Sequence, residues 1–167
     1  MSLIDLEISS ALANPVDVIE QFAERNDWVF DRSNDDEITI SMPGAYADYH
    51  VSFTWLEEMQ GLHLACAFDF KVNDRRRGEV LELLTRINER LWLGHFDIWA
   101  TAGILMFRQT MLLGRDGDVN PGQVDMLVKT AVETSERYFP AFQFVVWAGK
   151  TAQEALDAVI LETVGEA

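Results

Sequence analysis

The chain has 167 residues, 49% of them hydrophobic and 25% charged, a composition typical of a single folded globular domain rather than a disordered or fibrous protein. Its 13 basic and 28 acidic residues give a formal net charge of −15, which argues against sequence-independent binding to nucleic acid. We expect a cytoplasmic protein without a membrane span, because the single cysteine forms no internal disulfide, the N-terminus lacks a signal-peptide pattern, and no run approaches about 20 apolar residues.

The first half of the chain predicts one helix followed by four strands. The helix begins at Asn14-Pro15, an N-cap residue followed by proline at the first helical position, and ends near Arg25. Residues 1–13 are expected to form a disordered N-terminal arm. A short strand over 28–31 precedes three strands in which apolar and polar residues alternate, over 37–42, 49–55 and 62–70. The last two form a hairpin in which residue 55 faces residue 62 and residue 53 faces residue 64.

The second half predicts a helix, a hairpin and two more helices. Asp74 opens a helix with an apolar stripe of helical period, and Gly94 follows its end. A third helix runs from Pro121 to Phe139, where Pro140 is expected to kink it or to start a new segment. Thr151 with Glu154 opens the C-terminal helix. The order α-β-β-β-β-α-β-β-α-α predicts an α+β fold with a mostly antiparallel sheet, in one domain over residues 1–167.

The predicted hairpin, over 95–100 and 104–113, is apolar on both faces, whereas an antiparallel strand with one wet face should alternate. Something should therefore cover its second face, and a second copy of the chain is the economical explanation. Trp99 and Phe107, or whichever hairpin face points away from the helices, are candidates for a symmetric dimer contact. Trp92 is a second candidate, although it could equally cover an edge of the core.

Three consecutive arginines, Arg75, Arg76 and Arg77, lie in the predicted first turn of a helix, where the helix dipole disfavours positive charge. One interpretation is that they pair with acidic side chains of the same chain or of a dimer. The other is that they form a docking point for an acidic partner or an anionic ligand.

The sequence offers little catalytic or metal-binding chemistry. In the predicted register His50 and His63 are about 13 Å apart, too far to share an ion. Cys66 lies on an apolar face, where a thiol stays protonated and unreactive. No phosphate-binding loop, dinucleotide motif, nucleophile elbow or zinc-ligand spacing is present, so we expect no enzyme activity, cofactor or metal. His95 is expected to cap a helix or to pair with Asp97. A small enzyme with a site near His95, Asp97 and Arg108 is the alternative.

Three segments resemble the YbjN family, described as bacterial sensory transduction regulators. They are Asn88–Asp97, Tyr138–Phe144 with Trp147, and Glu162–Ala167; Asn26–Trp28 and Tyr49–Trp55 extend the likeness. The resemblance implies a fold like that of type III secretion chaperones, which are acidic, commonly homodimeric α+β proteins that bind extended segments of other proteins. It implies no catalytic residues. The short leading strand and the separate C-terminal helix depart from that fold.

The leading functional hypothesis is therefore a non-enzymatic protein-binding or regulatory module that acts as a homodimer, with an unidentified protein partner. A direct DNA-binding regulator is a weaker alternative, because the arginine cluster is small beside a charge of −15.

Overall fold

The computed structural model describes residues 14–114 and 118–165; the predicted N-terminal arm, residues 1–13, lies outside them. The elements follow the predicted order. They are α2 (Pro15–Arg25), β1 (Val29–Asn34), β2 (Glu37–Pro43), β3 (Asp48–Leu56), the short 3-10 turn η1 (Glu57–Met59), β4 (Gly61–Lys71), α3 (Arg77–Asn88), β5 (His95–Trp99), β6 (Ile104–Leu112), α4 (Pro121–Val146) and α5 (Ala152–Gly165).

The strands form one six-stranded sheet in the order β1-β2-β3-β4-β6-β5, with every neighbouring pair antiparallel. The predicted hairpin register is confirmed, since Trp55 pairs with Leu62 and Phe53 with Leu64. This α+β architecture confirms the predicted fold class.

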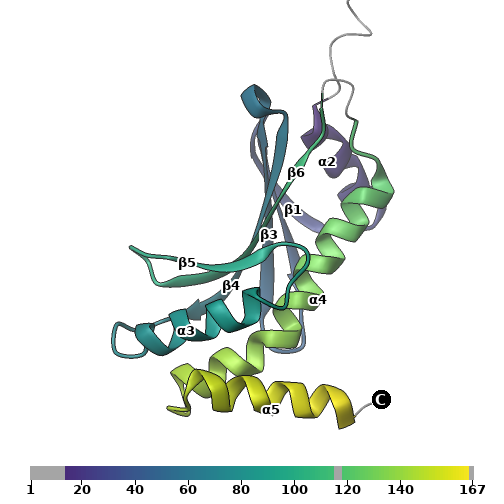
Figure 1. The fold of residues 1–167 in the computed structure, drawn as a ribbon. Helices are drawn as coiled ribbons and strands as arrows, with labels where there is room; N and C mark the ends of the chain where they lie inside the picture. The colour runs from purple at the N-terminus through teal and green to yellow at the C-terminus, as the bar shows by residue number, and fades with distance from the viewer. Residues whose placement is uncertain (1–13, 115–117, 166–167) are drawn as a thin grey trace, which may run out of the picture.

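The helices gather on one side of the bent sheet, with α2 and α4 along it, α3 beneath β5, and α5 packed against α3 and α4 (Figure 1). The strand side chains that point to this side are buried, among them Ile40, Phe53, Leu64 and Phe107. Aromatic rings close the core, with the Phe142 ring centroid 5.3 Å from that of Phe96. We call the opposite side of the sheet the open face, because no described helix covers it.

Local capping signals place three of the helices. The side chain of Asn14 accepts a hydrogen bond from the backbone N–H of Val16, at 2.9 Å. Asn120 and Gln123 bond reciprocally at the start of α4, in the capping-box arrangement. Thr151 and Glu154 do the same before α5. These predicted starts are correct because a cap depends only on residues two or three positions apart.

Two predicted helix boundaries are wrong. Helix α3 begins at Arg77 rather than at Asp74, because the Asn73 side chain accepts from the N–H of Arg76 and holds a turn there. Helix α4 continues through Pro140 to Val146, so Pro140 starts no new segment. Neighbours on both sides of the proline are fully or nearly buried, and their packing offsets the lost backbone hydrogen bond.

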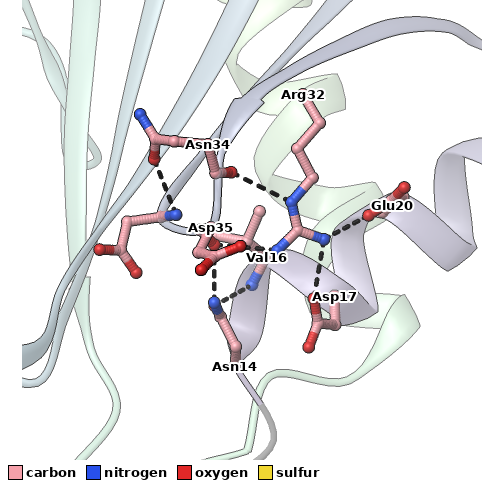
Figure 2. A network of polar contacts seen from close by, with 8 residues as sticks. Asn14, Val16, Asp17, Glu20, Arg32, Asn34 and Asp35 are labelled. Carbon is pink, nitrogen blue, oxygen red and sulfur yellow. Dashed lines mark hydrogen bonds and ion pairs between the residues drawn. The ribbon is translucent and has the colours of Figure 1, made fainter.

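An arginine on β1 attaches the first hairpin to α2. Arg32 lies between Asp17 and Glu20 of that helix and donates to the backbone carbonyls of Asn34 and Asp35 (Figure 2). The distance from Arg32 Nη1 to Asp17 Oδ1 is 2.7 Å, and the arginine side chain is only 21% exposed. The guanidinium neutralises two acids of the most acidic part of the chain, and its pKa is raised, mainly by the hydrogen bond to Glu20.

We expect the substitution Arg32→Ala to lower the free energy of unfolding by about 1–2 kcal/mol, because charge-assisted bonds from a half-buried group are lost and two carboxylates remain unpaired. Lys129→Ala is the matched control, since Lys129 pairs with Asp125 one turn away on the exposed surface of α4 and should contribute much less. Urea denaturation measures both. Equal effects of the two substitutions would contradict a special role for Arg32.

Candidate functional site: the open face of the sheet

The open face is polar over β2 and β3 and apolar over β4, β6 and β5. On the first two strands it presents hydroxyl groups, such as Thr39 and Ser52, whose oxygens are 2.8 Å apart. On the other three, the register aligns small and large apolar side chains. They are Ala65 and Ala67 of β4, Ile104 and Met106 of β6, and Trp99 of β5.

The two apolar faces of the β5–β6 hairpin have different environments. Phe96 pairs with Phe107, and both point into the core beneath the helices, with ring centroids 5.6 Å apart. Trp99 pairs with Ile104 on the open face, and 59% of Trp99 is exposed. The prediction that Phe107 belongs to a contact surface is therefore wrong, because Phe107 is fully buried. No described element of this chain covers the second face, so the prediction that a second copy covers it remains a prediction.

Three shallow hollows follow one another along this face. The first, of about 480 Å³, includes Ala65, Trp99 and Met106. It shares Ala67 and Ile104 with a second hollow that extends to Lys71. At its other end it shares His63 and Arg108 with a third, of about 500 Å³, which Trp92 and His95 also line. Together they form a trough above β4 and β6.

Basic groups meet where the first and third hollows join. His95 pairs with Arg108 across the β5–β6 ladder, and Arg108 Nη1 donates to Asp97 Oδ2 at 2.9 Å. On β4, Nδ1 of His63 is 2.9 Å from the hydroxyl of Thr110. The pKa of His63 is lowered, first by burial and then by repulsion from Arg108 and His95. The predicted pairing of His95 with Asp97 is not observed, since Asp97 pairs with Arg108.

All three histidines of the chain lie on the open face, yet they do not form a metal site. His50 pairs with Ala67, and His63 pairs with Thr54 as predicted, four positions farther along the sheet. Among the described residues, no group of three or more His, Cys, Asp or Glu side chains could hold a metal ion. The sequence predicted that His95, Asp97 and Arg108 lie close together, but not that His63 joins them, because nothing local shows that β6 lies between β4 and β5.

The arginine cluster has a structural role that neither interpretation foresaw. Arg76 donates to the carbonyls of Val145, at 2.8 Å, and Lys150, at 2.6 Å, and so caps the end of α4. Arg77 donates to the carbonyl of Ala100, in the β5–β6 turn. Only Arg75 is fully exposed. The partners of Arg76 and Arg77 are thus backbone carbonyls rather than acidic side chains.

Trp92, a candidate for a contact surface, and Cys66, considered for its reactivity, differ sharply in exposure. Trp92 is 99% exposed, so it covers no edge of the core, and it stands in the loop between α3 and β5. Cys66 is fully buried among the core side chains beneath α4, where the Ser135 hydroxyl is 3.8 Å from its sulfur. Burial raises the pKa of the Cys66 thiol to about 12, which keeps it protonated and unreactive.

Comparison with known proteins identifies the family. The family model for YbjN, described as "Putative bacterial sensory transduction regulator", matches residues 15–144. The chain belongs to the YbjN family. A solved structure described as "YbjN, a putative transcription regulator from E. coli" is similar to it with a TM-score of 0.51, at 13% sequence identity, over 93% of this chain and 96% of that one. No curated protein matches the chain.

The family description supports a regulatory role for this YbjN-family chain. No helix in the described part of the chain is long and apolar enough to cross a membrane.

In this YbjN-family chain, His63 should make stability depend on pH. Its pKa is below 6.5 in the folded state and ordinary in the unfolded state, so below about pH 6.5 the unfolded chain binds the proton more readily. Neutral His63 therefore contributes its full share to the free energy of unfolding above pH 6.5, and this contribution decreases as the pH falls. His63→Asn should therefore destabilise the protein less at pH 5 than at pH 8 in urea denaturation, whereas an equal or larger effect at pH 5 would contradict the burial of a neutral imidazole.

We expect Arg76→Ala to cost about 1–3 kcal/mol of unfolding free energy, because two hydrogen bonds from a charged donor are lost at the end of α4. Arg75→Ala, one residue earlier and exposed, should change stability by less than about 0.5 kcal/mol. Thermal or urea denaturation of the two variants compares them directly. If both leave stability unchanged, Arg76 does not hold α4 in place.

Proposed function

We propose that this chain is a non-enzymatic, cytoplasmic regulatory protein that acts by binding other proteins, and that it does so as a homodimer joined through the open face. The regulatory part follows the family description. The observation that carries the dimer is the placement of the helices on one side of the sheet, which leaves Trp99, Ile104 and Met106 on a side that no described part of this chain covers.

Charge favours a second copy as the occupant. A net charge of −15 makes two copies repel one another wherever their acidic surfaces meet. On β4, β5 and β6 the open face carries two acids, Asp69 and Asp97, and two bases, Lys71 and Arg108, so its formal charge balances. Coulomb repulsion between copies is therefore weak at this surface, and apolar burial can hold them together.

The size of the open face suits a stable contact. With six strands about 4.8 Å apart and about eight residues long, the whole face measures roughly 29 by 27 Å, or about 800 Å², of which the charge-balanced part over β4, β5 and β6 is about half. Specific protein interfaces bury about 800 Å² on each partner. In a two-fold contact the same patch serves both copies, so Trp99 of each would contact the apolar half of the other.

A protein partner would then use the surfaces that the dimer leaves free. The outer edges of β1 and β5 end the sheet and could accept an extended segment as an added strand, which is the kind of segment that type III secretion chaperones bind. Exposed Trp92 and Arg75 are further candidates for partner contacts. A role in regulation through proteins fits the charge of −15 better than direct binding to DNA.

The alternative of a small enzyme is less well supported. His95, Asp97 and Arg108 do lie together, but the ion pair between Asp97 and Arg108 is about 40% exposed, with side-chain values of 42% and 39%. The adjoining hollow is shallow and includes alanine, isoleucine and methionine side chains. Catalytic groups normally need a water-excluding cleft that perturbs their pKa values.

Sedimentation equilibrium at micromolar concentration tests the dimer. We expect a mass of two 19.0 kDa chains, and Trp99→Glu should weaken association by about 100-fold or more, because it places a charge in an apolar contact. Leu161→Glu on α5 is the matched control, since Leu161 is also largely exposed but lies on the helical side, and it should remain dimeric. A monomeric wild-type protein, or a Trp99→Glu protein that stays dimeric, would overturn the proposed contact.

A further inference from the structure

The junction of the first and third hollows combines basic donors with an apolar extension. His63, His95 and Arg108 line it from three neighbouring strands, β4, β5 and β6. From there the trough continues over Met106 and Ile104, which lie two and four residues from Arg108 on the same face of β6, roughly 7 and 14 Å away. The trough thus has a charged end at the junction and apolar side chains beyond it.

Several of these donors have no partner among the described residues. Arg108 uses only Nη1, on Asp97, which leaves Nε and Nη2 free to donate. With Nδ1 of His63 beside the Thr110 hydroxyl, a neutral imidazole that accepts from Thr110 carries its proton on Nε2 and can donate from there. The side chain of His95 is exposed and has no hydrogen-bond partner among the described residues. An oxyanion placed at the junction would receive charge-assisted hydrogen bonds from two or three of these groups.

The charge at the junction selects among anions. Arg108 lines the junction with a full positive charge, and Asp97 engages only its Nη1. A monoanion matches that single charge, whereas a dianion such as phosphate would add more negative charge to a protein of −15. A carboxylate also has the planar two-oxygen geometry that an arginine fork binds.

We propose that this junction binds a small monocarboxylate with an apolar tail, with the carboxylate at His63, His95 and Arg108 and the tail in the trough over Met106 and Ile104. The exposed rings of Trp92 and Trp99 stand beside the two hollows, where they can cover such a ligand. All the groups of this site belong to one chain, so the site does not require the dimer; the trough is also the surface proposed for the dimer contact, so the ligand and a second copy would compete for it.

Octanoate is the probe, and the chemical shifts of the histidine side chains and tryptophan indoles report its position. We expect saturable binding that shifts the His63 and His95 signals together with those of Trp92 and Trp99. Octan-1-ol, which has the tail alone, acetate, which has the head alone, and inorganic phosphate should each bind at least about tenfold more weakly, because each lacks one of the two features.

Two substitutions should move octanoate affinity in opposite directions. Arg108→Gln should weaken it about tenfold or more, because the principal cationic donor is lost, while Arg86→Gln on α3 should leave it unchanged. Asp97→Asn should strengthen it several-fold, because it removes the competing carboxylate and adds one positive charge to the site. If Asp97 only stabilised the fold, its substitution would not raise the affinity for octanoate.

The proposal is overturned if octanoate does not bind at millimolar concentration, if octan-1-ol binds as well as octanoate, or if Arg108→Gln binds octanoate like the wild type. Circular dichroism verifies that each variant is folded. Sedimentation of the same samples measures dimer formation separately. A failure of the carboxylate site can therefore be distinguished from a failure of the dimer contact.

Discussion

The placement of the helices on one side of the sheet determines most other properties of this molecule. The strands alternate strictly enough that one set of side chains forms the core and the other set is left facing outward. Helices α2, α3 and α4 pack against the first set, α5 packs on α3 and α4, and none of the described helices reaches the second set. The same constraint buries Phe107 and exposes Trp99, although the two residues lie in one hairpin and are both large and aromatic. The side chains of the open face are therefore the ones that the helices leave free for contacts with other molecules.

Charge is arranged in keeping with that division. Residues 1–60 carry 13 acids and 2 bases, a net of −11, and the described part of this stretch contains α2 and the first three strands. There Arg32 forms ion pairs with Asp17 and Glu20, and these pairs attach the β1–β2 hairpin to α2 (Figure 2). Residues 61–117, with 7 acids and 8 bases, supply the rest of the sheet. The part of the open face over β4, β5 and β6 is thus nearly neutral and apolar, although the molecule as a whole is strongly acidic. Two copies can meet at this surface with little Coulomb repulsion.

Membership of the YbjN family gives a regulatory context, and the open face offers two ways to act in it. A dimer contact and a carboxylate site would share the trough, and His63 and Arg108 belong to both of the hollows involved. A ligand held there would change which side chains remain for a second copy, so occupancy and association would be linked thermodynamically. Such linkage would give a small regulatory protein a means of responding to its surroundings.

The sequence by itself determined the elements and their local order. The caps at Asn14, Asn120 and Thr151, the alternation of the strands and the register of the β3–β4 hairpin all depend on residues close in the chain, so their physics is visible in the sequence. Only the tertiary structure decided the rest. It carried α4 through Pro140 because burial on both sides of the proline outweighs one backbone bond, and it turned Arg76 onto the carbonyls of α4 rather than onto acids. It also brought His63 to His95 and Arg108 of the predicted hairpin, because the pairing of β4 with β6 joins segments that no local pattern connects.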